Sequence, residues 1–147
     1  MIQTPRIVKV ISTLGLLPFS VGVLTTLKFP LLNPSFAPLL IKFSILYGAL
    51  ILSFLGGCLF AFECISQVKP NKSRLWIAIL PTLWALIALQ FESFSASILA
   101  IGFLLVYEFD RKSYAAGTVP SWWLSLRLPL TAAVILSLSI IGFYHGD

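Results

Sequence analysis

Long apolar runs, separated by short polar or proline-containing breaks, divide the chain into five segments. They cover about residues 8–27, 39–65, 75–91, 94–109 and 128–144. About 20 helical residues cross the roughly 30 Å hydrocarbon core of a bilayer, so the fourth run needs its flanks to span. Because a backbone in hydrocarbon must pair its own polar groups, each run is expected to be helical. The pattern predicts an all-α membrane protein: a five-transmembrane-helix bundle, with residues 1–147 as a single transmembrane domain.

The second run carries small residues at four-residue spacing. They are Ala49, Ser53, Gly57 and Ala61, with Gly48 and Gly56 beside them. Four residues exceed one helical turn by only about 40°, so the positions follow nearly one face. Small side chains let helices in a membrane approach each other closely. We expect this face to pack against other helices of the same chain, which are tethered nearby, more than against a second copy.

The basic residues indicate an orientation. With five spans, the N-terminus, the second-to-third connection and the fourth-to-fifth connection share one side. Of the ten Lys and Arg residues, eight fall there: Arg6, Lys9, Lys69, Lys72, Arg74, Arg111, Lys112 and Arg127. The other two are Lys28 and Lys42. Because basic residues concentrate on the cytoplasmic or matrix side, we predict the N-terminus inside and the C-terminus outside.

The acidic residues nearest the membrane lie close to these basic residues. Glu63 sits near the inner end of the second run, and Glu108 and Asp110 sit at the inner end of the fourth. Arg127 is the natural partner for Asp110 or Glu108. We interpret the set as interfacial ion pairs that fix helix ends. A proton or substrate site is the alternative, but it usually places an acid or base in the middle of a span, and none falls there.

The connection over residues 111–127 contains two adjacent tryptophans, Trp122 and Trp123. Tryptophans at a membrane edge most often lie at headgroup depth. We therefore predict a short interfacial segment before the last helix, with both tryptophans as anchors, lying on the inner surface until Pro129 enters the fifth span. An aromatic platform for a ligand is the alternative.

Composition supports a membrane protein and argues against a nucleic-acid partner. Hydrophobic residues make up 59% of the chain, charged residues 10%, and the mean hydropathy is +1.00; soluble proteins carry about 25% charge. The net charge of +5 comes from residues that flank apolar runs, so the expected partner is the lipid bilayer. Cys58 and Cys64 lie about 9 Å apart along one predicted helix and cannot form a disulfide with each other, so we interpret them as packing residues.

The sequence offers no catalytic or metal-binding constellation. The single histidine, His145, lies near the C-terminus with no cysteine or carboxylate set around it. Zinc or haem ligation and a Ser-His-Asp arrangement both need partners that are missing. Gly56-Gly57 lies within a predicted helix and does not form a phosphate-binding loop. We therefore expect no enzyme activity, no metal and no cofactor.

Several stretches resemble one family, the small membrane proteins of unknown function grouped with transmembrane protein 69 (domain of unknown function 3429). The matching pieces are GLLPF at Gly15–Phe19, YGALILSFLGG at Tyr47–Gly57, RLWIAILPTLWA at Arg74–Ala85 and DRKSYAAGTVPSWWLSLRLPLT at Asp110–Thr131. They cover most of the chain in the family's order. The resemblance implies a protein of about five spans in a bacterial or mitochondrial inner membrane, and it implies no known reaction.

The chain departs from the family's pattern at one place. In the family, the double glycine is followed by one residue and then His-Trp-Gly. Here Gly57 is followed by Cys58, Leu59, Phe60 and Ala61. If that histidine performs chemistry or binds a ligand in the family, this chain has lost it. The pieces that remain similar suit helix packing better than catalysis.

These observations favour a non-catalytic integral membrane protein, an accessory or assembly subunit of a larger membrane complex of the respiratory or other energy-transducing kind. The alternative is a small transporter or a lipid- or quinone-binding protein, which would need a cavity near Glu63, Tyr47 and Trp84. A membrane enzyme has the least support. Because Met1 precedes the first run without a transit peptide, we expect a bacterial inner membrane, with the mitochondrial inner membrane as the alternative.

Overall fold

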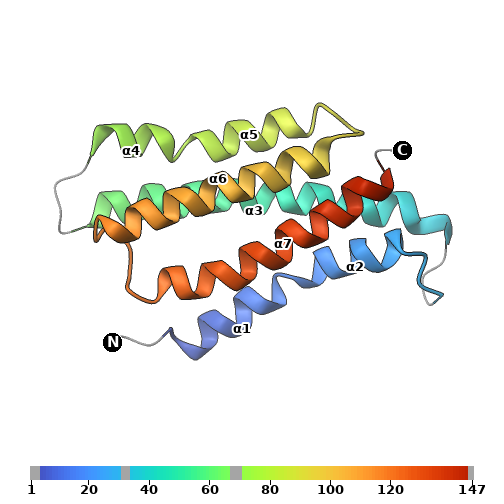
Figure 1. Cartoon of the computed structure of the whole chain (residues 1–147), viewed down its shortest axis with the longest axis horizontal. Helices are drawn as coiled ribbons and strands as arrows, with labels where there is room; N and C mark the ends of the chain where they lie inside the picture. The colour runs from blue at the N-terminus through green and yellow to red at the C-terminus, as the bar shows by residue number, and fades with distance from the viewer. Residues whose placement is uncertain (1–3, 31–33, 67–70, 146–147) are drawn as a thin grey trace.

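The structure, a computed structural model, describes residues 4–30, 34–66 and 71–145. These residues form α-helices, one short 3₁₀ helix and connecting turns, with no strand among them, which confirms the all-α prediction (Figure 1). The elements are α1 (Arg6–Leu14), α2 (Leu17–Thr26), η1 (Pro34–Phe36), α3 (Ala37–Ile65), α4 (Lys72–Ile77), α5 (Leu80–Ala88), α6 (Ser95–Ala115) and α7 (Trp123–His145). They correspond to five helical runs, because α1 with α2 and α4 with α5 are two broken helices.

Both breaks lie just before a proline. Pro18 falls in the first turn of α2, and Pro81 falls in the first turn of α5. A proline has no N–H for the carbonyl four residues earlier and its ring clashes with that carbonyl, whereas the first turn of a helix tolerates it. The kink expected near Pro18 is therefore present, and Pro81 produces a second one.

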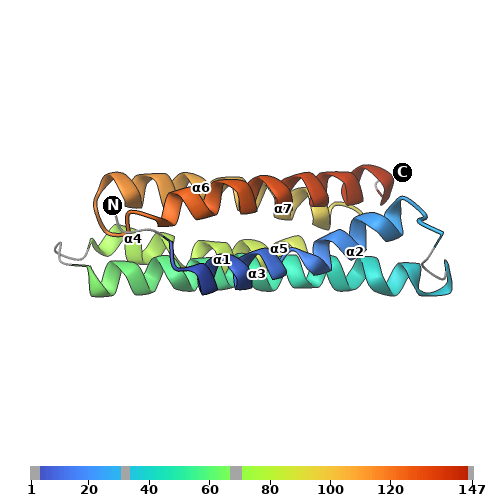
Figure 2. The same cartoon turned by 90° about the horizontal axis from the view of Figure 1, so that it is seen from below.

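The helical runs lie side by side as an elongated bundle (Figure 1). Contacts run around it from α2 to α3, α3 to α5, α5 to α6, α6 to α7 and α7 back to α2, and α3 also touches α6 across the middle. Seen from the side, α6 and α7 form one layer, while α2, α3 and α5 form the other (Figure 2). The start of α1 and the end of α7 lie toward opposite ends of the bundle (Figure 1).

The core between the layers is built from large apolar side chains. Phe19, Leu52 and Phe103 are almost completely buried. The Phe19 ring packs edge-on against Tyr47, with centroids 5.4 Å apart, and against Phe103, with centroids 6.4 Å apart. Edge-to-face pairs of this kind add to the gain from burial. Phe19 of α2 thereby ties α3 and α6 together at the centre of the bundle.

The small residues of α3 do not share one face, which corrects the sequence interpretation. Gly48, Ala49 and Gly56 are buried, whereas Gly57 and Ala61 are exposed. The half-buried Ser53 shares a 2.9 Å hydrogen bond with Thr82 of α5. The reason is geometric: steps of four residues drift by about 40° each, so the row turns through about 120° between positions 49 and 61. The buried face instead follows steps of three or four residues, through Ile41, Ser44, Gly48, Leu52, Leu55, Leu59 and Glu63, with Ala49 and Gly56 beside it.

Three helices are long and apolar enough to cross a membrane among the described residues. They are Arg6–Thr26, which joins α1 and α2 across the kink, Ala37–Ile65 and Trp123–Tyr144. The α4–α5 run is interrupted before Pro81, and α6 carries four charged residues toward its C-terminal end. The protein is therefore an all-helical membrane protein.

Candidate functional site

Charged residues gather where α3 and α6 end and α4 and α7 begin, which we call the basic end of the bundle (left in Figure 1). The basic residues of these elements that lie at this end are Lys72, Arg74, Arg111, Lys112 and Arg127, and α1 brings Arg6 and Lys9 toward the same end. Lys69, which the charge argument also used, lies outside the described residues. The three carboxylates that sequence analysis singled out, Glu63, Glu108 and Asp110, are here as well.

A buried ion pair joins α6 to α7. Arg127 Nε donates a 2.9 Å hydrogen bond to Asp110 Oδ2, and the two residues are 5% and 1% exposed. Trp123 Nε1 donates a 2.6 Å hydrogen bond to the other carboxylate oxygen, Oδ1. A buried carboxylate is tolerated only when it is paired and hydrogen-bonded, and Asp110 has both kinds of partner. The three side chains therefore form one buried polar cluster.

Helical spacing explains how the cluster forms. Trp123 and Arg127 are four residues apart, so their side chains lie one above the other on the same face of α7. Asp110 lies on the buried face of α6. The chain reverses between the two helices through Gly117, whose φ of 73° is a conformation that glycine adopts without strain. These two contacts from Trp123 and Arg127 to Asp110 hold the first two turns of α7 against the last turns of α6.

The cluster changes the interpretation of the tryptophans. Helix α7 starts at Trp123 and continues through Pro129, so residues 123–128 are its first turns and do not form the separate interfacial segment that was expected. Trp123 is buried, and its ring packs edge-on against Phe62 with centroids 4.8 Å apart. Trp122 is the half-buried member of the pair. The adjacent tryptophans therefore have different environments, and Trp123 is a buried hydrogen-bond donor.

Two polar atoms of α7 are left without partners. Among the described residues, Arg127 Nη2 and Thr131 Oγ1 are buried with no hydrogen bond. Thr131 follows Arg127 by four residues, about 6 Å further along the same face. Most buried polar side-chain atoms in proteins have a partner, because an unsatisfied donor costs about 1–3 kcal/mol. The unpaired guanidinium nitrogen therefore needs an explanation.

An apolar cavity of about 380 Å³ adjoins Arg127. Its walls come from α1, α2, α3, α6 and α7. Aromatic side chains are prominent in the lining, namely Phe19, Tyr47, Phe54, Phe103 and Trp123. Polar groups are few: besides Arg127, they come from Ser12, Tyr47, Cys58 and Trp123. The cavity is therefore largely apolar, with a guanidinium at its wall.

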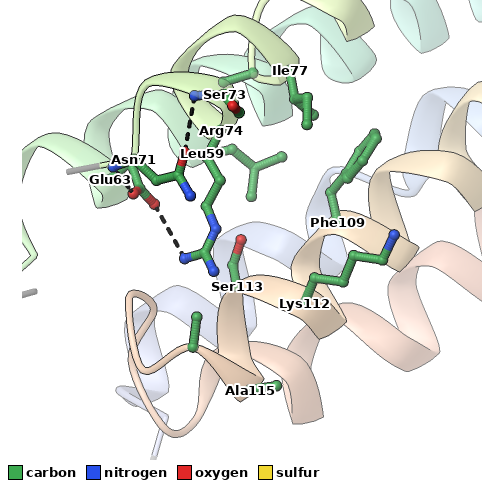
Figure 3. A pocket seen from close by; sticks show the side chains of 12 residues that line it. Leu59, Glu63, Asn71, Ser73, Arg74, Ile77, Phe109, Lys112, Ser113 and Ala115 are labelled. Carbon is green, nitrogen blue, oxygen red and sulfur yellow. Dashed lines mark hydrogen bonds and ion pairs between the residues drawn. The ribbon is translucent and has the colours of Figure 1, made fainter. Parts of the chain in front are cut away.

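A second cavity, of about 630 Å³, lies between α3, α4 and α6 at the basic end (Figure 3). Glu63 is 3% exposed on its wall. The backbone N–H of Asn71 donates a 2.8 Å hydrogen bond to Glu63 Oε1, and Arg74 Nη1 lies 3.7 Å from Oε2. The Asn71 side chain in turn accepts a 2.9 Å hydrogen bond from the Ser73 N–H and caps α4. These contacts satisfy Glu63 and fix where α4 begins.

The remaining residues singled out from the sequence have simpler environments. Glu108 pairs with Arg111 at 2.7 Å, one turn along α6, and both side chains are exposed. Tyr47 lines the cavity beside Arg127, and Glu63 lines the other cavity. Trp84 lines neither cavity and donates a 2.7 Å hydrogen bond from Nε1 to the carbonyl of Ile98. The structure therefore separates the three residues expected around one cavity.

Sequence reasoning did not single out Gly22, Gly102 or Thr131. A Cβ on Gly102 would lie 2.6 Å from Cδ1 of Trp84, and one on Gly22 would lie 2.5 Å from Oγ of Ser44. Both glycines therefore permit close helix contacts. In the sequence, each appears only as an isolated glycine inside an apolar run, and this pattern does not indicate which neighbouring helix the glycine contacts. Thr131 had no signal, because a lone threonine in such a run is common.

The described residues bring no group of three His, Cys, Asp or Glu side chains together as a metal site. Cys58 is half-buried, Cys64 is exposed, and both are free thiols. The cavity beside Arg127 offers hydrogen-bonding groups to a ligand, from the Arg127 side chain and from Ser12, Tyr47 and Cys58.

Comparison with known proteins agrees with this architecture. Residues 4–142 match the family described as "Protein of unknown function (DUF3429)". Over 99 residues, the chain is 36% identical to Transmembrane protein 69 of Xenopus tropicalis; the match covers 63% of this chain and 38% of that protein. The chain thus spans well under half the length of this relative. No solved structure matches the chain.

The family match covers almost the whole chain, including the residues of the Asp110–Arg127 cluster and the residues that line the cavity beside Arg127. It confirms the resemblance inferred from the sequence. The chain is a membrane protein that belongs to the DUF3429 family.

Proposed function

We propose that all five helical runs cross the membrane, with the N-terminus inside and the C-terminus outside. The clustering of Arg74, Arg111, Lys112 and Arg127 at the basic end supports this orientation, since basic residues favour the cytoplasmic or matrix side. Lys28 and Lys42 belong to the opposite end. An inner membrane, bacterial or mitochondrial, suits such a bundle. A topology reporter fused after Asp147 should be active only outside; activity only on the inner side would refute the orientation.

We propose that the protein is a non-catalytic accessory or assembly subunit of a larger membrane complex of the respiratory or other energy-transducing kind. The observation that carries this proposal is the uncovered small-residue face of α3. Gly57 and Ala61 are exposed, and a Cβ on Gly57 would meet no atom within 4 Å. Lipid gives helices no hydrophobic reason to associate, so close packing at small residues is a main source of contact. Open space beside Gly57 suits a helix of another subunit.

The test is purification from native membranes in a mild detergent, followed by identification of the proteins that accompany the chain in fixed ratio. Gly57→Leu should remove those proteins while leaving the thermal stability of the chain unchanged. Ala132→Leu is the matched control, because Ala132 is an exposed small residue on α7, and it should keep them. A chain that purifies alone, or equal retention of partners by the two variants, would count against the proposal.

A further inference from the structure

Arg127, one of the residues that line the apolar cavity, carries a hydrogen-bond donor that nothing in the described chain uses. Arg127 is 5% exposed and lines the cavity, its Nε is committed to Asp110, and its buried Nη2 has no partner. A guanidinium has five N–H donors and no acceptor, so only an oxygen or nitrogen acceptor can satisfy it. Since leaving such a donor unpaired in an apolar setting is costly, the site is suited to a molecule that brings an acceptor.

The charges of the cluster indicate whether the acceptor group of a ligand is charged or neutral. Asp110 already neutralises Arg127 at 2.9 Å, and Asp110 also accepts from Trp123. An anionic ligand would add a second negative charge beside the carboxylate, and the described residues that line the cavity include no cation besides Arg127. An uncompensated charge in a low-dielectric site is expensive. The acceptor should therefore be uncharged, which points to a carbonyl oxygen.

The size and the side chains of the cavity indicate what the rest of the ligand is like. Cavities of roughly 300–1,000 Å³ hold small molecules, and this one measures about 380 Å³. Phe19, Phe103 and Trp123 offer aromatic surfaces, and Tyr47 adds a hydroxyl 3.5 Å from the Cβ position of Gly15. Such walls suit a flat ring or an apolar chain more than a hydrated head group. The ligand should therefore carry its carbonyl on an apolar body.

We propose that this cavity binds a neutral, membrane-soluble amphiphile, with a carbonyl oxygen accepting from the Arg127 guanidinium and the apolar body among the aromatic side chains. The aromatic lining favours a carbonyl-bearing ring, as in a quinone; the ester carbonyl of a neutral acylglycerol has the same acceptor chemistry. This binding site does not depend on the accessory-subunit role. It uses the cavity beside Arg127, whereas that role uses the exposed face of α3 at Gly57 and Ala61.

The test uses the full chain in nanodiscs of phosphatidylcholine. One arm adds a benzoquinone with a ten-carbon chain and a photoreactive ring; the other adds a diacylglycerol with a photoreactive acyl chain. Labelled peptides are identified by mass spectrometry, and affinity follows from competition with the unlabelled molecule. Labels should fall on α1, α3 and α7, and the arm that gives them identifies the source of the carbonyl.

Two variants and a control probe the site. Ser12→Phe fills the cavity from α1 without touching the ion pair and should abolish labelling. Thr13→Phe adds the same ring at the next, exposed position and should label as the original chain does. Arg127→Lys keeps the positive charge but removes the planar pair of terminal nitrogens, and it should weaken binding about tenfold, the value of about one hydrogen bond.

Unfolding temperatures without ligand establish that each variant is folded, and if Arg127→Lys does not fold, Ser12→Phe decides the question. Equal labelling of Ser12→Phe and Thr13→Phe would overturn the proposal. So would labels outside the cavity, no labelling in either arm, or competition by anionic lipid but not by either neutral molecule.

Discussion

Gly56 and Gly57 are neighbours in the sequence but face opposite environments on α3. A Cβ on Gly56 would lie 2.6 Å from the carbonyl oxygen of Ala78 and 3.3 Å from two carbons of Pro81. A Cβ on Gly57 would meet nothing within 4 Å. The kinked α4–α5 run therefore rests directly on the backbone of α3 at Gly56, where only glycine fits.

We expect Gly56→Ala to destabilise the bundle by about 1–3 kcal/mol, because the added methyl group must push a backbone carbonyl away. Gly57→Ala should cause no loss and should raise the free energy of unfolding by up to about 1 kcal/mol, because alanine favours an exposed helical position over glycine. Unfolding in mixed micelles, followed by circular dichroism, measures both. Similar losses for the two variants would mean that the packing faces of α3 are assigned incorrectly.

This pair also shows what the sequence can and cannot predict. The apolar runs and their proline breaks predicted where the helices lie, because length and periodicity are local properties. However, α6 continues to Ala115 and α7 begins at Trp123, beyond the apolar limits of the fourth and fifth runs. Which glycine faces a neighbour depends on the rotation of α3 about its axis, and the four-residue repeat of small residues placed Gly57 on the wrong side. Rotation depends on the steps of three and four that bury Leu52, Leu55 and Leu59, and on partners distant in the sequence.

The candidate site could likewise be predicted only in part from the sequence. Asp110 and Arg127 stood out as charges at helix ends, and pairing them needed only the reversal between the fourth and fifth runs. The burial of Trp123 and the unpaired Nη2 of Arg127 could not be foreseen. They depend on how closely α6 and α7 pack beside α3, which no local pattern encodes.

The Asp110–Arg127 pair should show strong coupling. Asp110→Asn or Arg127→Gln alone leaves one buried charge without its partner and should cost about 3–5 kcal/mol. The double variant has no charge to bury and should recover much of that loss. A double-mutant cycle of unfolding free energies measures the coupling.

Glu108 and Arg111 provide the comparison for that cycle. Their carboxylate and guanidinium are 2.7 Å apart but about half exposed, so solvent screens the attraction. The coupling in the cycle of Glu108→Gln and Arg111→Gln should stay below about 1 kcal/mol. If the coupling energy of this surface pair equals that of Asp110 with Arg127, burial is not what makes the Asp110–Arg127 pair strong.

The two adjacent tryptophans should respond differently to the same substitution. Trp123→Phe keeps an aromatic ring but removes the Nε1 donor to Asp110, which should cost about 1.5–3 kcal/mol, because the lost bond is to a charged group. Trp122→Phe removes no hydrogen bond that α7 depends on and should cost less than about 1 kcal/mol. Thermal unfolding of the two variants under identical conditions gives the comparison, and equal losses would argue against the buried role of Trp123.

Glu63 should tolerate loss of its charge better than loss of its oxygen. Its nearest polar partner is the Asn71 N–H at 2.8 Å, whereas Arg74 lies 3.7 Å away with a side chain 34% exposed. Glu63→Gln retains an oxygen acceptor for that N–H and should cost less than about 1 kcal/mol, because the partly exposed ion pair contributes little. Glu63→Ala strands the N–H at the start of α4 and should cost about 1–3 kcal/mol. Unfolding free energies measure both, and protease cleavage near Lys72 reports whether α4 has come loose. A larger loss for Glu63→Gln than for Glu63→Ala would show that the charge itself is what this end of the bundle requires.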